Sequence, residues 1–244
     1  MHSRHDEALA DRGTAPGRLA LTGQRYPRFV LLLIAMLAEL TLAPFIELLP
    51  RGFLLVELVT AAVLLAALAV AGSHRIALLL FSAALIVHLA ATASADRVIV
   101  LAADAFRLIF LCYVVALVIH RVLTDRAVSL DTVAGAACAY MLLGVVWGDL
   151  FMLLESWHPG SFHVPLAWTQ GTGRTLRSSL MYFSFATLTT VGYGSIHPND
   201  PAAGSICAAE ALIGQLYLAI MIARLVGLHT SRTGSAGNDH GTSA

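Results

Sequence analysis

The residues of this chain best suited to binding chemistry are six consecutive ones, Thr189 to Gly194, which read TTVGYG. A dehydrated cation needs oxygen atoms in place of its water shell, and backbone carbonyls that face one narrow axis can supply them. An ordinary strand alternates the sides on which its carbonyls lie. Glycine adopts positive φ angles readily, so Gly192 and Gly194 allow the intervening carbonyls to turn the same way. The segment therefore predicts a loop whose backbone binds a cation.

The flanking sequence favours such a loop over an ordinary glycine-containing turn. An apolar, helix-compatible run covers residues 176–188, and Thr175 is placed to cap its amino end. A helix of about 13 residues is about 20 Å long, which is half-way through a membrane. Its carboxyl end carries partial negative charge, which favours a cation at the loop. After a link with two prolines, a long apolar segment follows at 203–228.

The run from Thr190 to Gly194 resembles the TVGYG selectivity filter of the potassium-channel family. The resemblance implies that K⁺ binds to the backbone carbonyls of Thr190, Val191, Gly192 and Tyr193 and to the hydroxyl of Thr190. It also implies that Thr189 and the aromatic side chains of Tyr182 and Phe183 support the filter.

The resemblance covers residues 140–228 well, and the chain departs from the family pattern at two positions within it. The residue after the filter, commonly aspartate, is Ser195. The glutamate that some members place four residues before the filter is replaced by Ala186. These departures bear on inactivation and gating rather than on the preference for K⁺.

The composition is that of a membrane protein. The chain has 244 residues, of which 58% are hydrophobic and 12% charged, and its mean hydropathy is +0.77. A soluble domain carries about 25% charged residues. The formal net charge of zero gives no indication of a nucleic-acid partner.

About 20 apolar residues are needed to cross a bilayer as a helix. Segments of this kind occur at 29–49, 53–72, 76–95, 98–123, 132–155 and 203–228. We therefore expect an all-α membrane protein with six transmembrane helices, in which a re-entrant pore helix and the filter loop lie between the last two.

The expected organisation has four parts. Residues 1–28 form a cytoplasmic tail, 29–131 a four-helix transmembrane region, 132–228 the pore domain, and 229–244 a disordered cytoplasmic tail. The four-helix region has the position of a voltage sensor but lacks a repeat of arginines. Its Arg107 lies three residues after Asp104, so a structural ion pair between them is favoured over voltage sensing.

The orientation in the membrane follows from the filter and from the arginines. If the filter faces outside, as the resemblance implies, both termini are cytoplasmic. Ten arginines are then assigned to the inside, among them Arg121 and Arg224 at the inner ends of two spans, and four to the outside, in agreement with the positive-inside rule. The expected location is the plasma or inner membrane of the cell.

Several residues of the last two spans have expected packing roles. Gly144 and Gly148 are spaced for close helix approach, with the last span as the expected neighbour, and Asp149 is expected near water. Gly214 is the expected hinge of the inner helix, although close packing explains this glycine nearly as well. Glu210 is interpreted as a packing partner behind the filter rather than an ion site.

Three histidines of the outer loops allow two interpretations. His158, His163 and His197 are all predicted near the outer mouth, where they are either solvated loop residues or a sensor of pH or metal ions. The solvated interpretation is favoured.

One chain has one pore loop, whereas a filter ring needs four, so the expected unit is a homotetramer. The expected function is passive K⁺ conduction across the lipid bilayer, without strong voltage gating. The chain shows no catalytic constellation, so no enzyme activity and no cofactor besides the permeant K⁺ are expected. The alternatives are a weakly selective cation channel, a non-conducting regulatory subunit or a K⁺ uptake component.

Overall fold

The computed structural model describes residues 28–49, 52–71, 96–125, 129–169 and 175–238, together with 79, 81–83 and 86. The elements in these ranges are nearly all helical. They are α1 (Arg28–Ile46), α2 (Gly52–Ala71), α4 (Arg97–Thr124), α5 (Leu130–Trp157), β1 (Phe162–His163), α6 (Leu166–Thr169), α7 (Leu176–Leu188), β2 (His197–Pro198) and α8 (Pro201–Asn238).

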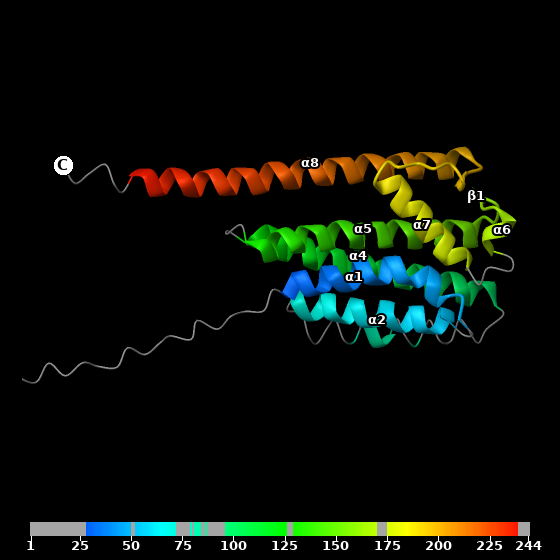
Figure 1. Ribbon diagram of the computed structural model, residues 1–244. Coiled ribbons are helices and arrows are strands. Elements are labelled where there is room, and N and C mark those ends of the chain that lie inside the picture. The colour runs from blue at the N-terminus through cyan, green and yellow to red at the C-terminus, as the bar shows by residue number, and fades with distance from the viewer. Residues whose placement is uncertain are drawn as a thin grey trace, which may run out of the picture.

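Helix α5 is the centre of the arrangement. It packs against α1 and α4 on one side and against α7 and α8 on the other, and α2 contacts α1 and α4. Figure 1 shows the short α7 slanting between α5 and the long α8, which lies along one side of the molecule. Only residues 125–129 separate α4 from α5, and such a short connection makes consecutive helices antiparallel neighbours.

Four of the described helices are long and apolar enough to cross a membrane: α1, α4, α5 and α8 as far as Leu228. Helix α2 contributes a shorter apolar stretch, Leu54–Val70. Most of the predicted span at 76–95 and the amino-terminal tail as far as residue 27 lie outside the described residues, so the count of six spans stays a prediction. Apolar side chains such as Leu31 and Ile109 are more than half exposed, as expected of a surface that lipid covers.

The largest core lies between α1, α2, α4 and α5. It contains fully buried side chains of α4 and α5, among them Leu111, Val114 and Leu142. Local signals set the ends of these helices: the Asp96 side chain accepts from the amide of Val98 at the start of α4, and the Ser129 side chain accepts from that of Thr132 at the start of α5.

The final helix is longer than the sequence predicts. Helix α8 continues beyond Leu228 to Asn238, where a disordered tail is expected from the polar composition. Within α8, Arg224 donates from Nη2 to the carbonyls of Leu123 (2.7 Å) and Asp125 (3.0 Å). Carbonyls at a helix end lack helical partners, so Arg224 fastens α8 to the end of α4.

Candidate functional site

The helix before the candidate filter has the predicted bounds. Helix α7 runs from Leu176 to Leu188, and the predicted cap, Thr175, forms a reciprocal capping box with Ser178. Its carboxyl end leads directly into the loop, because the amides of Val191 and Gly192 both bond to the carbonyl of Ala186, at 2.9 and 3.1 Å. The loop is thereby folded back against the end of the helix.

The φ angle changes sign along the loop backbone. The φ angles of Thr190, Gly192 and Gly194 are 59°, 57° and 79°. Among the described residues no other non-glycine has a positive φ, so the sign of φ alternates from Thr190 to Gly194. A backbone in which φ changes sign at every residue differs from an extended strand, where φ stays negative and the carbonyls alternate sides. The two glycines confirm the prediction that they adopt positive φ.

Thr190 extends the same two-residue pattern and was not predicted to be left-handed. A left-handed conformation costs a non-glycine residue about 1–2 kcal/mol. Such strained residues persist where the surrounding structure requires them, and they gather at functional sites. Gly192 and Gly194 are two residues apart, and Thr190 lies two residues before Gly192. This spacing is the sequence signal that could have predicted a positive φ angle at Thr190.

The candidate filter is uncovered in a single chain. All residues from Thr189 to Gly194 are exposed, including the large side chains of Val191 (52%) and Tyr193 (74%). Tyr193 stacks on Tyr182 of α7, with ring centroids 6.4 Å apart and planes 9° apart. The loop therefore packs against α7 on one side, and the same chain does not cover its other faces.

The three residues expected to support the filter lie next to it. Tyr182 contacts the Tyr193 ring, and the Thr189 hydroxyl donates to the Phe185 carbonyl at 2.6 Å. Phe183 is buried among aromatic rings, 5.4 Å from Phe151 and 5.6 Å from Phe162. These contacts hold α7 and the start of the loop in place.

The last residue of α7 is held from two sides. The Tyr140 hydroxyl of α5 donates to the Leu188 carbonyl at 3.0 Å. Helix α8 approaches the same carbonyl at Gly214, where an added Cβ would lie 2.8 Å from the oxygen. The glycine at this position thus allows a close approach of α8. The hinge function expected for Gly214 stays a prediction.

The glycine pair of α5 faces a different helix from the one predicted. A Cβ at Gly144 would lie 2.7 Å from the Phe185 ring, and one at Gly148 would lie 2.8 Å from the sulfur of Met181. Both neighbours belong to α7, so the prediction that the pair packs on the last span is wrong. The small residues let α7 lie tightly on α5.

Five charged side chains form one network across four helices. Arg107 pairs with Glu57 (3.1 Å) and Asp149 (3.0 Å), and Arg177 pairs with Asp104 (2.5 Å) and again with Asp149. The predicted pair of Asp104 and Arg107 is therefore replaced by three pairs with residues of other helices, two made by Arg107 and one by Asp104. Asp149 is also not near water, since its side chain is only 1% exposed. The spacing of residues along one helix could not predict these ion-pair partners, because each partner lies on another helix.

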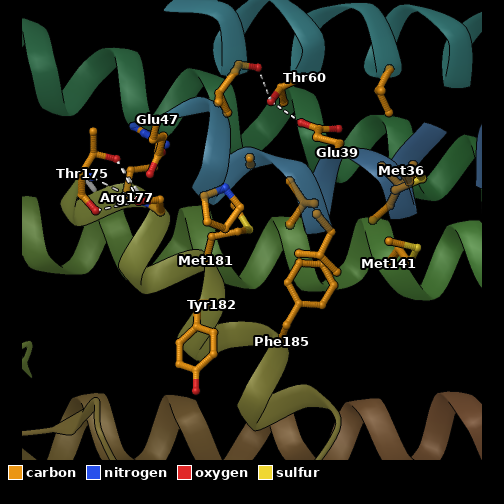
Figure 2. A pocket seen from close by; sticks show the side chains of 18 of the residues that line it. Met36, Glu39, Glu47, Thr60, Met141, Thr175, Arg177, Met181, Tyr182 and Phe185 are labelled. Carbon is orange, nitrogen blue, oxygen red and sulfur yellow. Dashed lines mark hydrogen bonds between the residues drawn. The ribbon is translucent and has the colours of Figure 1, made fainter. Parts of the chain in front are cut away.

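A cavity of about 560 Å³ lies between α1, α2, α5, α7 and the loop. Figure 2 shows the Thr60 hydroxyl bonded to Glu39 on one wall and Met181, Tyr182 and Phe185 of α7 on the other. Glu39 is the acceptor in this bond.

Two of the three outer histidines come together. His163 and His197 face each other across the β1–β2 pairing, and their rings stack with centroids 4.8 Å apart. His158 lies apart from them, within 3.4 Å of the Ser161 hydroxyl. In the part of the chain that the structure describes, no group of three or more potential metal ligands occurs.

Comparison with known proteins points to the same segment. Residues 136–230 match the protein family described as "Ion channel", a stretch that begins in α5 and contains α7, the loop and most of α8. No curated protein and no solved structure matches the chain. Residues 136–230 are therefore similar to an ion-channel domain, a class of domain that conducts ions across a membrane, and the described helices that are long and apolar enough to cross a membrane agree with a multi-pass membrane protein.

Proposed function

We propose that the chain is a K⁺-selective channel. The ions bind to the carbonyls of Thr190, Val191, Gly192 and Tyr193 and to the Thr190 hydroxyl. The observation that carries the proposal is the alternation of positive φ angles at Thr190, Gly192 and Gly194. A backbone of this kind presents a row of oxygens in place of the hydration shell of the ion.

The conducting unit is a homotetramer in a lipid bilayer. One loop supplies one wall of a filter, and a closed ring of four copies supplies the rest. The exposed Val191 and Tyr193 support this, because large side chains beside a narrow ion path are expected to be covered by neighbouring subunits.

The filter end of the bundle faces the outside, and both termini are cytoplasmic. This orientation follows the arginine distribution. Voltage has little effect on opening, because Arg107 is held by Glu57 and Asp149, and moving it would break both ion pairs. Conduction is passive and needs no cofactor.

Ion flux into liposomes tests the proposal. Purified full-length protein is reconstituted, and uptake is measured under matched K⁺ and Na⁺ gradients, with Gly192→Asp as the filter variant. The matched control is Gly227→Ala in α8, where an added Cβ meets nothing within 4 Å.

We expect K⁺ uptake well above Na⁺ uptake in the wild type and in Gly227→Ala, and none in Gly192→Asp. Equal uptake of the two ions would instead identify a weakly selective channel. A verified tetramer that carries neither ion under any membrane potential would favour a regulatory subunit.

A further inference from the structure

A carboxyl group is buried behind the candidate filter. Glu210 of α8 is completely inaccessible to solvent, and its Oε1 lies 2.6 Å from the hydroxyl oxygen of Ser184 on α7. The same hydroxyl oxygen lies 2.7 Å from the backbone carbonyl of Gly144 on α5. Ser184 is itself fully buried. Three helices of the ion-channel domain therefore meet at one serine.

The hydrogens at this serine can be counted. A serine hydroxyl donates one hydrogen, yet Ser184 has two oxygens within hydrogen-bond distance. The Gly144 carbonyl can only accept. If Glu210 were ionised it could also only accept, and one of the two short contacts would have no hydrogen. If Glu210 carries a hydrogen, both contacts of Ser184 can be hydrogen bonds.

We propose that Glu210 is held as a neutral carboxylic acid and acts as a positioning residue for α7. Its Oε1–H donates to the Ser184 hydroxyl oxygen, and the Ser184 hydroxyl donates to the Gly144 carbonyl. The two hydrogen bonds run in one direction across α8, α7 and α5. This inference concerns the domain itself and is independent of which ion is conducted.

The surroundings of Glu210 agree with a neutral group. Among the described residues no ion pair involves Glu210, and its Oε2 is buried without a hydrogen-bond partner. The titratable side chains affected by the charge of Glu210 are Tyr140 of α5 and Cys207 of α8, and both are uncharged near neutral pH. An isolated buried carboxylate is far more costly than a neutral acid.

The two hydrogen bonds from Glu210 to Ser184 and from Ser184 to Gly144, called the relay below, lie close to the end of α7 from which the loop begins. Ser184 lies two residues before Ala186, whose carbonyl receives the amides of Val191 and Gly192. Gly144, at the other end of the relay, packs against the Phe185 ring. A neutral Glu210 therefore connects α8 to the start of the loop without placing a full negative charge behind the candidate filter.

Infrared spectroscopy tests the protonation state directly. The full-length wild type and Glu210→Gln are compared in liposomes at neutral pH, so that all other carboxyl groups cancel in the difference spectrum. We expect the wild type to show the C=O band of a protonated carboxyl that Glu210→Gln lacks. A carboxylate band in the same difference spectrum would overturn the proposal.

Heat resistance of the assembled protein tests the relay. A glutamine amide can donate to Ser184 as a protonated acid does, so Glu210→Gln should keep the wild-type Tm while Glu210→Ala and Ser184→Ala lose several degrees. The matched control is Glu155→Gln: both Glu155 oxygens accept from backbone amides, Gly160 at 2.7 Å and Phe162 at 3.0 Å. That substitution should lower the Tm. Equal losses in Glu210→Gln and Glu210→Ala would overturn the relay.

Discussion

Arg107 of α4 donates from Nε to Oδ2 of Asp149 on α5 over 3.0 Å, in a site where Arg107 is 15% and Asp149 1% exposed. The other oxygen of Asp149 pairs with Arg177 of α7. One carboxylate thus joins the peripheral helix α4 to α7, the helix that ends at the candidate filter. The position of α7 therefore depends on the negative charge of Asp149, which is neutralised by arginines of α4 and α7.

Loss of the Asp149 charge should destabilise the fold strongly. Asp149→Asn leaves two arginines without their shared partner, and breaking a buried pair costs about 3–5 kcal/mol. Glu57→Gln is the control, because the Glu57 side chain is 32% exposed and a more exposed pair contributes about 1 kcal/mol or less. Thermal unfolding in detergent measures both variants. Equal losses would contradict the assigned importance of Asp149.

The Thr190 hydroxyl should contribute to conduction. Thr190→Ala removes the oxygen and keeps the rest of the loop, so we expect K⁺ flux to fall about fivefold to tenfold, equivalent to about 1 kcal/mol. Thr190→Ser keeps the oxygen and should conduct like the wild type. Flux measured in liposomes with equal amounts of tetramer distinguishes them. Wild-type flux in Thr190→Ala would exclude the hydroxyl as a ligand.

Gly214 should be sensitive to added volume. An alanine Cβ would lie 2.8 Å from both Cδ1 and the carbonyl oxygen of Leu188, and overpacking of this kind costs about 1–3 kcal/mol. The control is Gly204→Ala, whose Cβ would meet only Pro198 at 3.9 Å and should gain stability from helix propensity. Thermal unfolding compares them. Altered opening without lost stability in Gly214→Ala would support a hinge instead.

The start of α8 should depend on pH through Asp200. Hydrogen bonds from the amides of Ala203 (2.9 Å) and Ala202 (2.8 Å) hold the pKa of Asp200 below its usual value of 3.8. A depressed pKa means that the stabilisation is complete above the unfolded pKa and is lost as the pH falls through the folded pKa.

Asp200→Asn, which resembles protonated aspartate, provides the comparison. The wild type should have the higher Tm at about pH 7, and the difference should vanish at about pH 2. A Tm difference that does not change over this range would show that the charge of Asp200 has no effect on the cap.

The local features of the domain could be predicted from sequence, whereas the contacts between helices could not. The bounds of α7, its cap Thr175 and the positive φ of Gly192 and Gly194 depend on neighbouring residues alone, and all are as predicted. The partners of Arg107 and the helix facing Gly144 depend on how distant segments pack. Spacing along one helix carries no information about them, and those predictions were wrong.

The length of α8 shows a second limit. Its polar end, with several glycine and serine residues, predicts a disordered tail, yet the helix continues to Asn238. Helix formation propagates more easily than it begins, so a long preceding helix extends into a segment that has weak preference of its own.

The reversal potential with K⁺ on one side of a bilayer and Na⁺ on the other tests the central claim most directly, because it measures selectivity independently of how many channels open. A tenfold preference for a monovalent ion corresponds to about 59 mV. We predict a reversal potential well beyond that value, in the direction of K⁺ selectivity, for the reconstituted wild type. A conducting protein whose current reverses near zero would contradict a K⁺-selective filter at Thr190 to Tyr193.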